Sequence, residues 1–266
     1  MKEDRKELII DYMQKHNETA SVAELCEYFQ VSDMTIRRDL QALEKAQKLI
    51  RHHGGATLVQ APTSQYTAES LHTRLLTNHS LKMDLGSFGA ELLREAIDSG
   101  TCNSVFLASG STLYCMASLI RFPLTNATVV TDNVNVSQAL ASNPSYTVIM
   151  IGGQLIFPSL NAVGHLAEKM IRSFTYDYAF IGAAAIDENG YVYTYNLIEA
   201  GTFHAIVESA KHVVVIADSS KICQKTFVQL FQLKEGFTLI TNPDIPETFR
   251  STLQSNGVRI VTEHAV

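Results

Sequence analysis

The sequence has few cysteines, and their positions argue against a fold held together by zinc or by disulfides. Only four occur among 266 residues, and they lie far apart: Cys26, Cys102, Cys115 and Cys223. They form no Cys-x-x-Cys pair, and no histidine stands near them at the spacing of a metal ligand. The pattern argues against a structural zinc site and a disulfide framework, and it predicts buried free thiols.

The sequence also lacks a long apolar run and a targeting segment. The longest nearly uninterrupted apolar stretch, residues 178–186, has nine residues, whereas a membrane-spanning helix needs about 20. The N-terminus is charged and leads into no apolar region, so a secretory signal is not expected. With 46% apolar and 18% charged residues, the composition indicates a soluble, globular and cytoplasmic protein without a membrane partner.

Positive charge is scarce overall but concentrated in one short segment. The length favours two domains or one large domain, and the formal net charge is −6. Within residues 34–55, two carboxylates are outnumbered by five cations: Arg37, Arg38, Lys45, Lys48 and Arg51. A basic segment in an acidic protein suggests localised contact with a polyanion. A solvated helix face is the alternative that charge alone leaves open.

The beginning of the chain shows the apolar spacing of short helices. The first covers about residues 5–16. The second begins after Ser21, an N-cap residue with Glu24 as its capping-box partner. Because both are short and amphipathic, we expect them to pack against a third helix to form a small domain.

The third helix, capped by Ser32 or Asp33 and ending near residue 46, has two distinct faces. One is an apolar stripe of Ile36, Leu40 and Leu43. The opposite face holds Met34, Arg38, Gln41 and Lys45, with Arg37 and Lys48 beside them. Such a helix fits the DNA major groove, where arginine pairs with guanine and glutamine with adenine, while lysines meet phosphates.

Two short strands around His52-His53-Gly54-Gly55 predict a hairpin with the shape of a basic wing. The strings V-S-D-M-T-I-R-R-D-L (residues 31–40) and L-I-R-H-H-G-G-A (residues 49–56) resemble the winged helix-turn-helix signature of the DeoR family of bacterial transcriptional regulators. That resemblance implies that DNA is contacted by Thr35, Arg37 and Arg38, with Arg51 and the Gly54-Gly55 tip beside them.

The helix face and the resemblance together define one predicted DNA-contacting set. It comprises Ser32, Met34, Thr35, Arg37, Arg38, Gln41, Lys45, Arg51, His53, Gly54 and Gly55. The plain alternative is that Arg37 and Arg38 are ordinary surface cations. His52 and His53 are interpreted as polar wing residues, because no cysteine or carboxylate completes a metal site around them.

The rest of the chain alternates between helical and β-like segments. Residues 59–80 contain Pro62 and little apolar periodicity, so we interpret them as a linker or a linking helix. The β-like runs beyond it are residues 104–108, 127–131, 147–151, 178–181, 212–217 and 238–241. This alternation predicts an α/β fold with a largely parallel sheet.

Small and polar residues follow most of these runs, where the ligands of open α/β sheets bind. The Ser109-Gly110-Ser111-Thr112 turn opens a helix and offers N–H and hydroxyl groups to an anion, and Lys221 or Lys82 adds positive charge. We therefore predict a site for a phosphorylated small molecule, formed by Lys82, Ser109, Gly110, Ser111, Thr112, Thr131, Asp132, Asn133, Gly152, Gly153, Asp218 and Lys221. The alternative is that the glycines form ordinary turns, Asp218 caps a turn and Lys221 is solvated.

This half also resembles the C-terminal sensor domain of the DeoR family, which is similar in fold to ribose-5-phosphate isomerase. The similarity runs from Arg74 and Lys82 through the strings S-G-S-T, V-V-T-D-N, I-G-G, D-Y-A-F-I-G and A-D-S-S-K. The sequence departs from the family at two places. Ala108 stands where the family commonly has an aspartate, and Phe203-His204 stand where it commonly has a Lys-Arg pair. The losses alter the groups available to recognise an effector.

The combined prediction is an α/β protein in three parts: a winged helix-turn-helix domain at residues 1–58, a linker at 59–80, and an effector-sensing and oligomerisation domain at 81–266. The resemblance implies a repressor of a sugar, polyol or sugar-acid operon that leaves DNA when a phosphorylated effector binds. Its expected partners are operator DNA, that effector and further copies of the chain in a dimer or tetramer. No cofactor and no metal is expected.

Two other interpretations of the larger domain remain open at this point. An isomerase-like enzyme with an added N-terminal domain would draw acid and base groups from Asp218, Lys221, Glu199 and Asp132. A vestigial oligomerisation module beside a working DNA-binding domain is the other.

Overall fold

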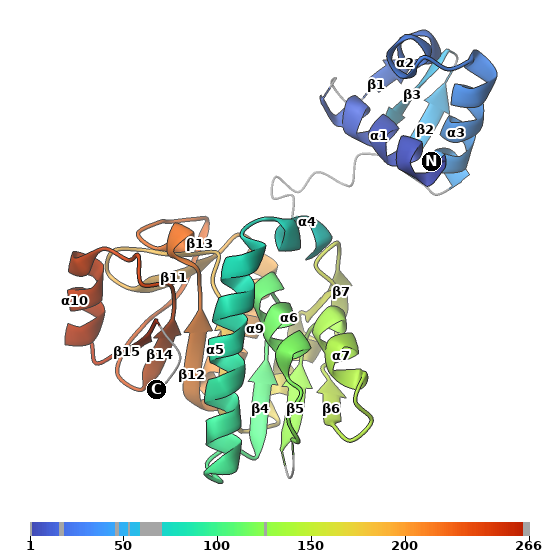
Figure 1. The fold of residues 1–266 in the computed structure, drawn as a ribbon. Coiled ribbons are helices and arrows are strands. Elements are labelled where there is room, and N and C mark those ends of the chain that lie inside the picture. Colours follow the sequence, from blue (N-terminus) through green and yellow to red (C-terminus); the bar gives the residue numbers. More distant parts are fainter. Residues whose placement is uncertain are drawn as a thin grey trace. The chain divides into compact units, whose positions relative to one another are not determined.

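The chain divides into two compact units, Met1–Thr67 and Ala68–Val266. The structure is a computed structural model, and it describes residues 2–15, 19–45, 48–52, 54–58, 71–124 and 127–262. Figure 1 shows the elements of both units.

The first unit contains helices α1 (Lys2–Lys15), α2 (Val22–Phe29) and α3 (Asp33–Lys45), and strands β1 (Thr19–Ser21), β2 (Leu49–His52) and β3 (Gly55–Leu58). The strands form an antiparallel sheet in the order β1-β3-β2. Its core is built from Ile9 and Met13 of α1, Leu25 of α2, and Ile36 and Leu40 of α3. The three helices and the hairpin agree with the sequence prediction, whereas the three-residue strand β1 was not predicted.

Local hydrogen bonds explain how α2 begins and how the chain turns into α3. The Glu24 N–H donates to Ser21 Oγ at 3.1 Å, and the Ser21 N–H donates to Glu24 Oε2 at 2.7 Å, so the predicted capping box is present. Gln30 ends α2 in the left-handed region at φ 53°. The Ser32 carbonyl then accepts the N–H groups of Thr35 and Ile36, which starts α3 within three residues of the end of α2.

The second unit is built on a sheet of parallel strands. Within the described residues this sheet has the order β15-β14-β12-β9-β4-β5-β6, and every pair in it is parallel. The strands are β4 (Ser104–Leu107), β5 (Thr128–Thr131), β6 (Thr147–Met150), β9 (Tyr176–Gly182), β12 (Ala210–Ile216), β14 (Phe237–Ile240) and β15 (Arg259–Val261). All six predicted runs lie in it, and the short strand β15 was not predicted.

Helices cover both faces of this sheet. Figure 1 shows α5 (His79–Asp98), α6 (Ser111–Leu119) and α7 (Val134–Ala141) in front of the strands. The other face packs against α8 (His165–Arg172), α9 (Leu197–Ser209) and α10 (Glu247–Ser255). Alternate residues of β4 point to opposite cores: Val105 and Leu107 belong to one and Phe106 to the other. Burial on both faces explains why these strands are nearly continuous apolar runs.

Smaller elements complete the second unit. Helix α4 (Leu71–Leu76) precedes α5, and it lies in the segment that was interpreted as a linker. Strands β7 (Gln154–Ile156) and β8 (Asn161–Val163) form a hairpin, and β10 (Ala185–Ile186), β11 (Tyr191–Thr194) and β13 (Val228–Gln232) form an antiparallel sheet.

Two expectations from composition can be compared with the structure. All four cysteines are free, and Cys102 and Cys115 are buried, but Cys223 is exposed. The expectation of buried thiols was therefore wrong for Cys223, which lies just after a short turn at φ 56°, and it holds only in part for Cys26, which is half-buried. Among the described helices, none combines the length and the apolar character needed to cross a membrane.

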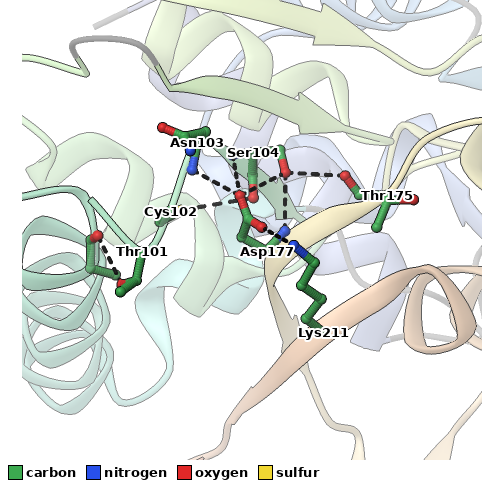
Figure 2. Close-up of polar contacts among 8 residues, drawn as sticks. Thr101, Cys102, Asn103, Ser104, Thr175, Asp177 and Lys211 are labelled. Carbon is green, nitrogen blue, oxygen red and sulfur yellow. Dashed lines mark hydrogen bonds and ion pairs between the residues drawn. The ribbon is translucent and has the colours of Figure 1, made fainter. Parts of the chain in front are cut away.

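One carboxylate ties together the amino-terminal ends of three central strands. Figure 2 shows Asp177 of β9 beside residues that precede or begin β4 and β12. Its carboxylate accepts the Asn103 N–H at 2.9 Å, the Ser104 N–H at 3.1 Å and Lys211 Nζ at 2.8 Å. Burial by itself raises the pKa of Asp177, but the hydrogen bonds from Lys211, Asn103 and Ser104 outweigh it and lower the pKa to about 2.

We predict that Asp177→Asn lowers the unfolding free energy of the second unit by about 1–3 kcal/mol at neutral pH. Because the folded-state pKa is depressed, this stabilisation is present above the ordinary aspartate pKa and is lost as the pH falls through about 2. Urea unfolding of both proteins at pH 6 and pH 3 measures the effect, and the difference should shrink at pH 3. Lys211→Met leaves the backbone hydrogen bonds to Asp177 intact, so it should lower the unfolding free energy less than Asp177→Asn does. An equal difference at both pH values would contradict the assignment.

Candidate nucleic-acid interface and ligand cavity

Helix α3 separates its side chains into a buried stripe and an exposed face, as the sequence predicted. Ile36, Leu40 and Leu43 are buried. The exposed side chains include Met34, Arg37, Arg38, Gln41 and Lys45, and Met34 is 81% exposed. Ser32 is exposed and Thr35 is partly buried where the helix begins. The predicted contact residues of α3 therefore share one accessible surface.

Two of the predicted cations are held by carboxylates of the same unit. Arg37 Nε donates to Asp33 Oδ1 at 2.5 Å, and this hydrogen bond lowers the pKa of Asp33. Arg51 uses its backbone N–H and its Nε to bind Glu44, at 3.1 and 2.9 Å, so strand β2 is fastened to α3.

Three other predicted contact residues on α3 keep their polar groups available. Within the described part of the chain, no side-chain hydrogen bond or ion pair is made by Arg38, Gln41 or Lys45. These three are therefore the side chains that can meet DNA without first breaking a contact.

The hairpin of β2 and β3 lies close to the start of α2. Gly54 has φ 92°, and its carbonyl accepts the Val22 N–H at 2.9 Å. A Cβ on Gly55 would lie 2.5 Å from the Ala20 carbonyl oxygen, so only glycine fits there. A groove of about 480 Å³ between the hairpin and α3 is lined by Val22, Arg37, Leu40, Glu44, Arg51, His52, Gly54 and Gly55. The predicted contact His53 lies outside the described residues.

A carboxylate that the sequence analysis counted as surface charge has a structural role. Asp39 is buried on the inner side of α3, and its Oδ2 accepts Arg5 Nε of α1 at 2.7 Å. This ion pair fixes α3 against α1. It also keeps Asp39 away from the exposed face of α3.

A cavity in the second unit lies beyond the carboxyl ends of β4, β9 and β12. This cavity has a volume of about 530 Å³. The predicted effector residues that line it are Lys82, Ser109, Gly110, Ser111, Thr112, Asp218 and Lys221. Its position agrees with the rule that ligands of open α/β sheets bind at this edge.

One wall of the cavity is the beginning of helix α6. Gly110 precedes the helix at φ 139°, and no side chain of the described residues caps this end. Ser111 and Thr112 form the first turn, both buried and both lining the cavity. An uncapped helix N-terminus presents N–H donors and the positive end of the helix dipole, a combination that favours an anion.

Basic side chains converge on the same cavity from three elements. Lys221 Nζ donates to the Ala183 carbonyl at 2.9 Å, and burial lowers the pKa of Lys221. Lys82 of α5 donates to the carbonyls of Arg74 and Thr77, at 2.5 and 2.7 Å, and Arg74 of α4 itself lines the cavity. Asp218 also lines it, while its Oδ1 accepts the Ser220 N–H and hydroxyl and caps the short turn that carries Lys221.

Five predicted effector residues do not line the cavity: Thr131, Asp132, Asn133, Gly152 and Gly153. Thr131 is fully buried. Asn133 caps α7 through the Val136 N–H and binds Asn161. Gly152 follows β6, and a Cβ on Gly153 would lie 2.8 Å from the Val163 carbonyl, so helix and hairpin packing accounts for that glycine.

Asp132 lies in a smaller pocket behind the cavity. This inner pocket is lined by Ser109, Asp132, Asn161, Val163, Glu199, Thr202, Phe203 and Ile206. Glu199 accepts Asn161 Nδ2 at 2.9 Å and Thr194 Oγ1 at 3.0 Å. Burial, and next the charge of Glu199, raise the pKa of Asp132 to about 7, and burial also raises the pKa of Glu199.

The two departures noted in the sequence have definite places. Ala108 is buried in the core at the end of β4. Phe203 lines both the cavity and the inner pocket, whereas His204 is exposed and lies 3.1 Å from the Leu230 carbonyl. The carboxylates that line the inner pocket are Asp132, which follows β5, and Glu199 of α9, whereas β4 supplies none.

Several cavity residues were not in the predicted set. Arg74, Thr77 and Asn78 lie in the segment interpreted as a linker, where no apolar period indicated a site. Asn161 and Tyr195 come from a hairpin and a turn far along the chain. Within the described residues, no three His, Cys, Asp or Glu side chains are grouped to hold a metal ion.

Comparison with known proteins agrees with both units. The DeoR-like helix-turn-helix domain matches residues 5–61, and the DeoR C terminal sensor domain matches residues 77–243. The glycerol-3-phosphate regulon repressor of Escherichia coli (strain K12) is 28% identical over 98% of this chain and 99% of the relative. The HTH-type transcriptional repressor GlcR of Bacillus subtilis (strain 168) is 30% identical over 98% of this chain and 96% of the relative.

Among solved structures, ribose 5-phosphate isomerase A from Methanocaldococcus jannaschii aligns with a TM-score of 0.38 and 15% identity over 55% of each chain. A likeness at this level supports no inference about activity.

The winged helix-turn-helix unit and the α/β sensor unit together define a DNA-binding regulator with a small-molecule sensor domain. The chain belongs to the DeoR family of transcriptional regulators. The relatives are transcriptional repressors, which confirms the prediction of a DNA-binding repressor over the isomerase-like enzyme.

The raised pKa of Asp132 predicts how stability changes with pH. The folded state holds this proton up to about pH 7, so the stability of the parent protein falls as the pH rises from about 4 to about 7. Asp132→Asn cannot ionise, and its stability relative to the parent should increase by about 2–4 kcal/mol between pH 4 and pH 8. Urea unfolding at both values measures this. Asp177→Asn is the control and should show no such increase, and the same absence in Asp132→Asn would refute the assignment.

Proposed function

We propose that this protein represses a carbohydrate catabolic operon in the bacterial cytoplasm and leaves its operator when a phosphorylated sugar, polyol or sugar acid binds the sensor cavity. The observation that carries the proposal is the meeting of an uncapped helix N-terminus with Arg74, Lys82 and Lys221 around one cavity. A phosphate group matches this combination of N–H donors and cations.

The DNA-binding part of the proposal assigns roles to the face of α3. Arg38 and Gln41 are exposed and free of other contacts among the described residues, so they are placed to read base edges. Lys45 serves a phosphate, and Arg51, held by Glu44, positions the wing beside the helix.

The effector part rests on the chemistry of the cavity and on the relatives. One relative is named for a glycerol-3-phosphate regulon, and a phosphorylated carbohydrate suits a cavity of about 530 Å³ with a cationic end. Carboxylates and amides elsewhere in the wall, including Glu199 and Asn161, suit hydroxyl groups.

Regulation is proposed to act through an assembly of identical chains. Two recognition helices can occupy neighbouring half-sites when they lie about 34–36 Å apart. An effector can release the DNA only if it binds one arrangement of the assembly more tightly than the other. We therefore expect a dimer or tetramer whose DNA-competent arrangement is disfavoured by the effector.

Arg38→Ala tests base reading. It should weaken binding to the protein's own operator by about 1–3 kcal/mol and relax specificity at one base position. Lys45→Ala should weaken binding to all sequences and lower the salt dependence. Fluorescence anisotropy with the upstream DNA of its own gene and with a scrambled duplex separates the two effects. Equal losses on both duplexes for Arg38→Ala would rule out base reading.

Lys221→Ala tests the division of labour between the units. Operator affinity should stay within about twofold of the parent, while release of DNA by the effector should be lost, because the variant lacks one of the cations that line the cavity. Lys169→Ala, on the exposed side of α8, is the matched control and should respond like the parent. Loss of operator affinity in Lys221→Ala alone would contradict the proposal.

A panel of phosphorylated sugars, polyols and sugar acids, titrated into the anisotropy experiment, tests the effector directly. Release of the DNA by one compound supports a repressor with a working sensor. Tight operator binding that no compound disturbs would overturn the effector proposal and favour an oligomerisation module.

A further inference from the structure

The inner pocket contains buried polar atoms without partners. Asp132 is 4% exposed and Thr202 is 2% exposed. Within the described residues, Asp132 Oδ1 and Thr202 Oγ1 form no hydrogen bond. A buried polar atom left unpaired costs about 1–3 kcal/mol. Two such atoms lining one pocket indicate that a ligand completes them.

The pocket borders the proposed effector cavity. Ser109, Asn161, Glu199 and Phe203 line both spaces. Ser109 also precedes the first turn of α6, where the phosphate is proposed to bind. A molecule held at that helix end therefore has its other end directed along a shared wall toward Asp132.

The chemistry of the lining selects hydrogen-bond donors. No lysine, arginine or histidine lines the inner pocket among the described residues, whereas Asp132 and Glu199 both do. Both oxygens of Glu199 already accept a hydrogen bond, from Asn161 and Thr194. The unfilled acceptor is therefore Asp132 Oδ1. A hydroxyl or ammonium group can donate a hydrogen bond to this oxygen, whereas an ionised phosphate or carboxylate has no proton to donate.

We propose that this inner pocket is the specificity subsite of the sensor: Asp132, with Thr202, binds a hydrogen-bond-donating group, hydroxyl or ammonium, at the end of the effector opposite its phosphate. The assignment rests on the proposed function of the cavity, and it deepens it by naming the head group. Burial, and next the charge of Glu199, raise the pKa of Asp132 in the free protein.

Phe203 controls entry to this subsite. In the structure the inner pocket has no space for a water molecule, and Phe203 forms part of the wall between it and the cavity. The phenyl ring must rotate or the middle of α9 must shift when a ligand enters. Binding is therefore accompanied by a rearrangement at α9.

Isothermal titration calorimetry of the full chain tests the subsite. Glucose 6-phosphate, glucosamine 6-phosphate and glycerol 3-phosphate carry donors beyond the phosphate, whereas ethyl phosphate and inorganic phosphate carry none there. The parent should bind at least one donor-bearing compound about tenfold or more tightly than ethyl phosphate. Comparison of glucose 6-phosphate with glucosamine 6-phosphate shows whether the group is a hydroxyl or an ammonium.

Two variants remove the proposed contacts with little change of shape. Asp132→Asn should reduce that preference to below about threefold and leave the affinity for inorganic phosphate unchanged. Thr202→Val should weaken the binding of the donor-bearing compound about fivefold. Thr241→Val is the matched control, since Thr241 Oγ1 is also buried and unpaired but lines neither space, and it should bind like the parent.

The outcomes separate this inference from the proposed function. Unchanged preference in both Asp132→Asn and Thr202→Val, with binding still lost in Lys221→Ala, would overturn the subsite and leave the effector cavity standing. Failure of every phosphate compound to bind the parent would overturn the cavity and the subsite together. A loss of preference in Thr241→Val equal to that in Thr202→Val would also overturn the subsite.

Discussion

Parallel pairing of β4, β9 and β12 is the constraint on which the sensor unit depends. Because their register is parallel, the strands end at one edge of the sheet, and the residues that follow them are brought together from positions more than 100 apart in sequence. Asp177 fixes the opposite ends of the same strands, so one partly exposed carboxylate supports the geometry of the cavity without being near it.

The DNA-binding unit relies on a comparable internal fastening. Arg5 and Asp39 join α1 to α3, and Glu44 and Arg51 join α3 to the hairpin. In each pair, a carboxylate that is not a predicted DNA contact holds in place an element that carries predicted DNA contacts. The exposed face of α3 is thereby presented by a rigid support, which lowers the conformational entropy lost on binding.

How far the sequence predicts the structure depends on the distance over which each feature is determined. The capping box at Ser21 and the apolar stripe of α3 are set by neighbours within one or two turns, so periodicity and spacing are sufficient. The strands of the parallel sheet are recognisable because burial on both faces makes them apolar runs. Three-residue strands such as β1 and β15 carry too few residues to show a pattern.

Apart from Lys82 on α5, the candidate site was predictable where it follows a strand. Ser109 to Thr112 and Lys221 were found in this way, whereas Arg74 lies in a short helix without apolar periodicity. Asn161 reaches the inner pocket through the β7 and β8 hairpin, a long-range packing that no local pattern reveals. Gly152 and Gly153 occupy the expected strand end, yet their surroundings are helix and hairpin, because β6 is the edge strand of the sheet.

The pairing of Arg37 with Asp33 and of Arg51 with Glu44 also affects how the protein meets a polyanion. At distances beyond a Debye length, two of the cations on this surface are cancelled by their own carboxylates, and the chain as a whole carries a formal charge of −6. Electrostatic attraction to arbitrary DNA is correspondingly weak. Occupancy of the genome by this protein is then governed by short-range fit at a matching sequence, so few molecules are held on unrelated DNA.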